Sequence, residues 1–89
     1  MDKMHRQIRE SLQSMAPRRA IALVEEMQLP ADEARTVIEC DVRRRSCVEA
    51  ARSMNVSPET VKAYRRRAYT KMADELKYGE TYVGVVLHK

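Results

Sequence analysis

The stretch SCVEAARSMNVSPETVK, residues 46–62, decides the fold. Ser46 and Glu49 have the spacing of a capping box, in which the hydroxyl accepts from the amide three residues on and the carboxylate accepts from the Ser46 amide. Ser57, directly before a proline, is typical of a second helix N-cap. Asn55 tolerates the left-handed backbone that a tight turn between helices requires. We therefore predict a short helix, a turn and a second helix within this stretch.

Small and apolar residues surround the predicted turn. Two alanines in the middle of the first helix allow a close approach of another helix, and Met54 and Val56 can fill the space beneath the turn. Val61 then lies on the inner face of the second helix. This pattern is typical of a helix-turn-helix, in which a steep angle lets the second helix enter the DNA major groove. We predict a helix-turn-helix over residues 46–76, with a recognition helix at about 58–76.

Three further helices are predicted upstream by apolar residues at helical spacing. Their expected inward positions are Met4, Ile8, Leu12 and Met15, then Ile21, Val24 and Met27, then Ala34, Val37 and Ile38. Pro17 ends the first segment or begins the next, and Pro30 fits the first turn of the third. The expected fold class is all-α, a compact bundle of about five helices in one domain over residues 1–78.

The C-terminal tail, residues 79–89, differs in kind from the rest. Its segment from Thr81 to Leu87 is β-branched and aromatic, so it favours an extended strand. A single strand is not stable alone, so we expect it to pair, to lie against the helices or to stay loose. The tail is a candidate dimerisation arm.

Charge is unevenly spread along the 89-residue chain. Residues 1–42 carry six basic and eight acidic residues, whereas residues 43–78 carry ten basic and four acidic ones. A basic half on a small domain suits a polyanionic partner. The alternative interpretation of the charge alone is a solvated basic face. Hydrophobic residues make up 44% of the chain without any Trp or Phe, which favours packed helices over a sheet.

The two cysteines, Cys40 and Cys47, show no zinc-binding spacing, and the two histidines lie at opposite ends of the chain. We expect no metal and no cofactor, and two free thiols in a reducing cytoplasm. The polar N-terminus has no secretory pattern, and no apolar stretch is long enough for a bilayer. No catalytic set or glycine-rich phosphate loop is present, so the sequence predicts a protein that is not an enzyme.

The recognition helix offers a set of candidate DNA contacts. Helical geometry turns Glu59, Lys62, Ala63 and Arg66 outward when Val61, Ala68 and Met72 face the core. These four are the predicted base contacts, because cations donate to guanine, Glu accepts from cytosine and Ala can touch a thymine methyl. The predicted phosphate contacts are Arg43, Arg44, Arg45, Ser57, Thr60, Tyr64, Arg65, Arg67 and Lys71. Tyr64 is ambiguous, since it can instead pack on the third helix.

Three segments together resemble region four of bacterial sigma factors and the related LuxR/GerE-type DNA-binding domains. They are residues 29–38, 46–62 and 66–72, and the resemblance covers about residues 28–76. Its most specific part is Ser57-Pro-Glu-Thr-Val-Lys62. The resemblance implies that the helix starting there is the recognition helix and that Ser57, Glu59, Thr60, Lys62, Ala63 and Arg66 are the matching DNA-contact positions. Asn55 stands where the family usually has Gly, and Ala50 where it usually has a larger aliphatic residue.

Two function hypotheses follow. The first is a cytoplasmic, nucleoid-associated regulator of bacterial or phage type that binds double-stranded DNA, expected as a homodimer because one recognition helix reads few base pairs. The alternative is a sigma-region-four-like module that docks on RNA polymerase or another transcription protein through its acidic first half. Neither hypothesis involves a membrane or a small-molecule ligand.

Overall fold

A computed structural model describes residues 3–78, and every regular element in that range is helical. The elements are α1 (Lys3–Ser14), α2 (Pro17–Glu26), α3 (Ala31–Val37), a π-helical turn η1 (Ile38–Val42), α4 (Cys47–Met54) and α5 (Pro58–Tyr78). The predicted all-α bundle of about five helices is confirmed. The expected extended tail, residues 79–89, lies outside the described residues.

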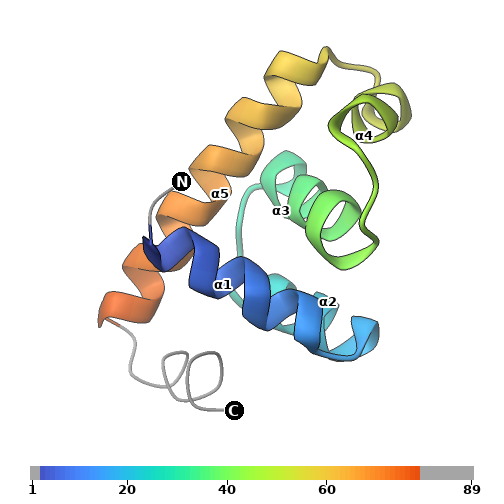
Figure 1. The fold of residues 1–89 in the computed structure, drawn as a ribbon. Helices are drawn as coiled ribbons and strands as arrows, with labels where there is room; N and C mark the ends of the chain where they lie inside the picture. The colour runs from blue at the N-terminus through green and yellow to red at the C-terminus, as the bar shows by residue number, and fades with distance from the viewer. Residues whose placement is uncertain (1–2, 79–89) are drawn as a thin grey trace.

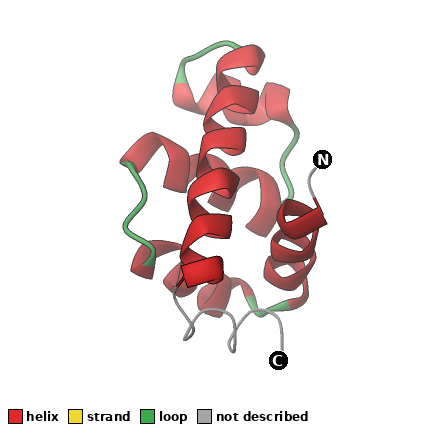
Figure 2. Ribbon diagram, turned by 90° about the vertical axis from the view of Figure 1, so that its left-hand side faces the viewer, coloured by secondary structure: helices red, strands yellow, loops and turns green. Residues whose placement is uncertain are grey.

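The long helix α5 organises the bundle. It runs the length of the molecule, and α1, α3 and α4 pack against it (Figure 1). The view turned by 90° shows α5 in front of the other helices, with short loops between them (Figure 2). The start of α5 and the whole of α4 form one end of the molecule, away from α1 and α2 (Figure 1).

The larger part of the core lies where α1, α2, α3 and the second half of α5 meet. Its buried residues are Ile8, Leu12, Ala20, Leu23, Val24, Val37, Ala68, Tyr69 and Met72. Met4, Met15, Met27, Ala34 and Ile38 pack against it while staying partly exposed. The helical spacing therefore identified the inward faces of the first three helices, although Ile21, expected inward, is only half-buried.

A second, smaller cluster lies under α4. It consists of Cys40, Ala50, Ala51 and Val61, with Cys47 and Val56 against it. Cys40 and Cys47 are both free thiols, of which Cys40 is buried and Cys47 only half-buried. The closeness of α4 to α5 follows from Ala50 and Ala51, because alanine side chains allow two helix backbones to approach.

The third helix departs from the expected regular helix. Pro30 is the residue before α3 rather than its first helical residue, and after Val37 the backbone widens into η1. The amide of Arg43 donates to the carbonyl of Ile38 at 2.8 Å, five residues back, which defines the π-helical turn. The wider turn ends at Val42, with Arg43 as its C-cap, and Arg44 follows with a φ of 60° in the loop that leads to α4.

Within residues 3–78, we find no helix that has both the length and the apolar character needed to cross a lipid bilayer.

Candidate nucleic-acid interface

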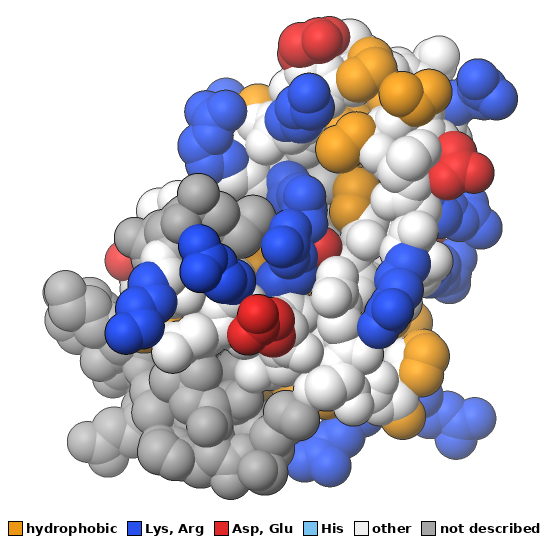
Figure 3. Space-filling model, viewed as in Figure 1, with side chains coloured by type: hydrophobic (Ala, Val, Ile, Leu, Met, Phe, Trp, Pro, Cys, Tyr) orange, Lys and Arg blue, Asp and Glu red, His pale blue; other side chains and the backbone are white. Residues whose placement is uncertain are grey.

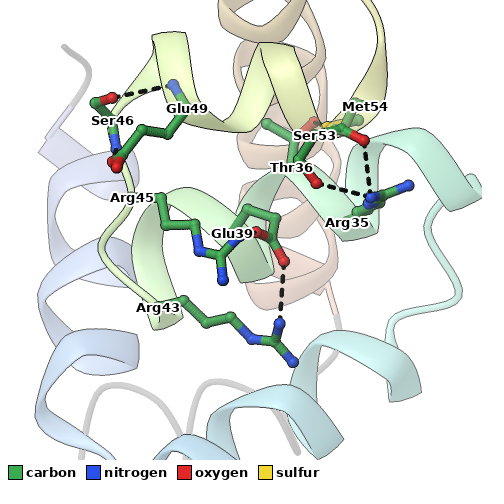
Figure 4. Close-up of polar contacts among 9 residues, drawn as sticks. All are labelled: Arg35, Thr36, Glu39, Arg43, Arg45, Ser46, Glu49, Ser53 and Met54. Carbon is green, nitrogen blue, oxygen red and sulfur yellow. Dashed lines mark hydrogen bonds and ion pairs between the residues drawn. The ribbon is translucent and has the colours of Figure 1, made fainter.

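The junction between α4 and α5 is built from local hydrogen bonds. The Ser46 hydroxyl accepts from the Glu49 amide at 3.1 Å, and the Glu49 carboxylate accepts from the Ser46 amide at 3.0 Å (Figure 4). These hydrogen bonds to Ser46 lower the pKa of Glu49. Asn55 ends α4 in the left-handed conformation, with φ 60° and ψ 44°. The predicted capping box and the predicted conformation of Asn55 are both confirmed.

The start of α5 follows this turn immediately. The Thr60 amide donates to the Ser57 hydroxyl at 3.1 Å, so Ser57 is the N-cap that the sequence predicts. The hydroxyls of Ser57 and Thr60 also lie 2.9 Å apart in a hydrogen bond with each other. Val61 is completely buried one turn into α5, and this fixes which side of the helix faces outward.

The predicted base contacts lie on the outward side of the first half of α5. Glu59, Lys62 and Arg66 are exposed, and none of them forms an ion pair with another residue in the range 3–75, where side chains are described. Ala63 is half-buried, so its methyl group is less open to a partner than the sequence pattern suggests. The arrangement leaves two cations and one carboxylate free to contact another molecule.

Arg65, a predicted phosphate contact, is used inside the protein. Its Nε donates to Oδ2 of Asp41 at 3.0 Å, and its Nη2 donates to Oδ1 of the same carboxylate. Tyr69 donates its hydroxyl to Asp41 Oδ2 at 2.6 Å. Asp41 is 0% exposed. Arg65 balances its charge, and both carboxylate oxygens accept hydrogen bonds from Arg65 or Tyr69.

The electrostatics of this buried group agree with its geometry. Burial raises the pKa of Tyr69, and the neighbouring charge of Asp41 raises it further. For Arg65, burial alone lowers the pKa, but the hydrogen bond and the charge of Asp41 outweigh it and the pKa is raised. The phenol therefore stays neutral and the guanidinium stays charged over the whole physiological pH range. The group joins η1 to the middle of α5.

Lys71 is paired in a similar way. Its Nζ lies 2.8 Å and 3.0 Å from the two carboxylate oxygens of Glu33, a buried residue of α3. This pair joins α3 to α5 one turn and a half beyond Arg65. Two of the predicted phosphate contacts on α5, Arg65 and Lys71, therefore hold the helix in place.

The run Arg43–Arg45 divides in two. Arg43 and Arg45 both form ion pairs with the buried carboxylate of Glu39, and their side chains remain 53% and 47% exposed (Figure 4). Glu39 Oε1 lies 3.0 Å from Arg45 Nη1 without the alignment of a hydrogen bond. Arg44 donates to the carbonyl oxygen of Gln13 on α1 at 3.1 Å. All three guanidinium groups can still be reached from solvent.

The remaining predicted phosphate contacts are Tyr64 and Arg67. Tyr64 is half-buried, which leaves both of its expected roles open. Arg67 is exposed and forms no ion pair with any described residue. No three His, Cys, Asp or Glu side chains within residues 3–78 come together in a way that could hold a metal ion.

The buried acids were missed in the sequence analysis. Asp41 comes four residues after Val37, a predicted inward position, and Glu33 comes four residues before it. Residues four apart lie on the same face of a helix, so this spacing could have placed both carboxylates inward. Tyr69 comes three residues before Met72, another predicted inward position, so helical spacing could have placed it inward as well.

Comparison with known proteins finds no family model, curated protein or solved structure that matches this chain.

Proposed function

We propose that this protein is a sequence-specific regulator of transcription that binds double-stranded DNA and places the first half of α5 in the major groove. The observation that carries the proposal is the exposed set Glu59, Lys62 and Arg66, which has no ion pairs among the described residues and directly follows a capped turn. Lys and Arg donate to guanine O6 and N7, and Glu accepts from cytosine N4. The three side chains together carry the chemistry of base readout.

The proposed phosphate contacts surround this set. Arg67 is exposed, and the amides of the first turn of α5 favour an anion because of the helix dipole. Arg43, Arg44 and Arg45 belong to the proposed contacts because their side chains are exposed despite their internal partners. Arg65 and Lys71 contribute by holding α5 against η1 and α3. The resemblance of residues 28–76 to sigma region four and LuxR/GerE domains agrees with this proposal.

The test is the selection of bound duplexes from a random DNA pool. The wild-type chain should enrich a short common site, and the double variant Lys62→Ala/Arg66→Ala should not, because each good base contact contributes ~1–3 kcal/mol of discrimination. The matched control is Arg18→Ala/Arg19→Ala, which removes two exposed cations from α2. A double variant of Lys62 and Arg66 that still enriches the wild-type site contradicts the proposed reading helix.

We also propose that the regulator acts as a homodimer in a bacterial or phage-type cytoplasm. A single helix in the groove reads only a few base pairs, and two half-sites a helical turn apart supply the missing specificity. Sedimentation of the free and DNA-bound protein measures the oligomeric state. A monomer bound to a site without two-fold symmetry rules the dimer out.

The alternative function, docking on RNA polymerase or another transcription protein, has one specific observation in its favour. Val48 on α4 is 54% exposed, and it is the only large hydrophobic residue so exposed within residues 3–75, the range whose side chains the structure describes. Val48 is the apolar contact point on α4 that this alternative assigns to polymerase or another transcription protein. Loss of polymerase capture in Val48→Asp, with unchanged DNA selection, is the result that supports this alternative.

A further inference from the structure

The helix α1 lies against the same side of α5 that carries Tyr69. The rings of His5 and Tyr69 have centroids 5.8 Å apart, and Ile8 and Leu12 share the core with Tyr69. Buried residues therefore hold α1 against α5 and set the rotation of α1 about its own axis. Its exposed side chains have defined positions relative to α5.

One side of α1 carries three residues spaced one turn apart, and the first two of them lie near Tyr69 of α5. His5, Arg9 and Gln13 are four residues apart and so lie on one side of the helix. Burial is the largest cause of the raised pKa of Tyr69. Arg9 is close enough to Tyr69 for its positive charge to lower this pKa. Arg44 reaches the carbonyl of Gln13 at the end of the same side.

This side of α1 carries more positive than negative charge. Arg6 precedes Arg9 by three residues, is exposed, and forms no ion pair with another described residue. Glu10 follows Arg6 by four residues, so it lies on the same side of α1 as Arg6, one turn further along. Arg6, Arg9 and Arg44 outnumber this one carboxylate, and together they form what we call the cationic row, over residues 6–13 and the loop beside them, about 10 Å long.

The cationic row continues into the proposed reading surface. Lys62 precedes Tyr69 by seven residues, which is two turns of α5 and ~10 Å along the same face. Arg66 lies between them, one turn from Tyr69. Figure 3 shows Lys and Arg side chains on this face of the molecule, over α1 and along α5 above it, with an acidic side chain among them. Basic side chains are therefore found on this face from α1 to the first half of α5.

We propose that Arg6 and Arg9 of α1 bind the DNA backbone beside the groove that α5 enters. This inference rests on the proposed function and adds a contact surface that lies outside residues 43–71. The row suits a phosphodiester strand because one strand carries a charge every ~3.4 Å of helix axis, so about 10 Å spans roughly three phosphates. Arg9 is half-buried as a residue, and an arginine can bury its stem against the protein while its charged head reaches a phosphate. These contacts are independent of base sequence.

The experiment measures DNA affinity over a series of salt concentrations by fluorescence anisotropy. The probe is the duplex that the wild-type chain selects from a random pool. Each phosphate contact contributes ~0.9 to the slope of log affinity against log salt concentration. We expect Arg6→Gln/Arg9→Gln to reduce this slope by about 1–2 and to leave the selected base sequence unchanged. Circular dichroism confirms that the variant is folded.

The control is Arg18→Gln/Arg19→Gln, which removes the same charge from α2, a helix that packs on α1, α3 and η1. Equal slopes for the two double variants overturn the role of α1 and leave the proposed function intact. A changed site preference in Arg6→Gln/Arg9→Gln also overturns it, because a backbone contact carries no base information. If the wild-type chain selects no duplex, the proposed function and this inference are both wrong.

Discussion

Replacing Asp41 by asparagine removes the charge at the centre of the contact between η1 and α5 and keeps nearly the same shape. The wild-type carboxylate accepts three hydrogen bonds, two from Arg65 and one from Tyr69. An asparagine offers a single oxygen and places its own amide donors against these donors. The variant therefore leaves at least one buried donor without an acceptor.

The expected cost is about 3 kcal/mol in the free energy of unfolding. Breaking a buried ion pair by neutralising one partner costs roughly 3–5 kcal/mol. The Arg65 side chain is 23% exposed, so water solvates part of its charge and the value lies at the lower end of this range. The loss of the acceptor for the buried Tyr69 hydroxyl is of the order of 1–3 kcal/mol and forms part of this total.

Urea denaturation followed by far-UV circular dichroism measures this loss. With a denaturant slope of ~1–3 kcal/mol per molar, the midpoint should fall by about 1–3 M. The control is Asp74→Asn, which neutralises an exposed carboxylate of α5 and should change stability by less than ~0.5 kcal/mol. A loss below ~1 kcal/mol for Asp41→Asn would refute the structural role of this carboxylate.

Two further predictions concern α4 and its surroundings. Replacing Asn55 by valine should lower the free energy of unfolding by ~1–2 kcal/mol, because Asn55 has a φ of 60° that a β-branched residue adopts poorly. Glycine at this position should change the free energy of unfolding by less than ~1 kcal/mol. Urea titration measures both variants, and a valine variant that is as stable as the wild type contradicts the turn geometry. Burial raises the pKa of Cys40 from 9.0 to about 11, with smaller contributions from Cys47 and Asp41, so the folded state keeps the thiol proton to higher pH than the unfolded state. The stability that the protonated thiol provides is complete below pH 9 and is lost as the pH rises toward 11. Over that interval, the difference in the free energy of unfolding between the wild type and Cys40→Ala should therefore shift in favour of the variant. Urea titrations at a series of pH values measure this shift.

Local interactions made the junction between α4 and α5 predictable from the sequence. The capping box and the Ser57 cap each depend on residues three positions apart, so the sequence itself contains both partners. The left-handed turn at Asn55 follows from one side chain that tolerates it. By contrast, Gln28 and Arg44 also have positive φ, and nothing in their residue type predicts it.

The ion pairs of Arg65 and Lys71 could not be assigned from the sequence because they join residues that are far apart in the chain. Asp41 binds Arg65 24 residues away, and Glu33 binds Lys71 38 residues away. From the sequence alone, Arg65 and Lys71 look like Lys62 and Arg66, because all four lie on one basic helix. Only the packing of α3 and η1 against α5 separates cations that hold the fold from cations that remain available.

The unequal division of the core has a consequence for how the molecule opens. The buried apolar side chains of α4 are Ala50 and Ala51, and two methyl groups contribute only ~1–2 kcal/mol of burial. Two further contacts secure its C-terminal end: Arg35 of α3 donates to the carbonyl and hydroxyl oxygens of Ser53 at 3.2 Å and 2.9 Å (Figure 4). The second half of α5 instead shares the larger cluster through Tyr69 and Met72.

Amide hydrogen exchange should therefore proceed at two levels. Segments with little buried apolar contact exchange through partial opening, whereas those in the main core exchange only through global unfolding. The amides of α4 belong to the first class and those of α5 near Met72 to the second. A partner that lies across α4 would then increase protection there before it changes protection in the rest of the molecule.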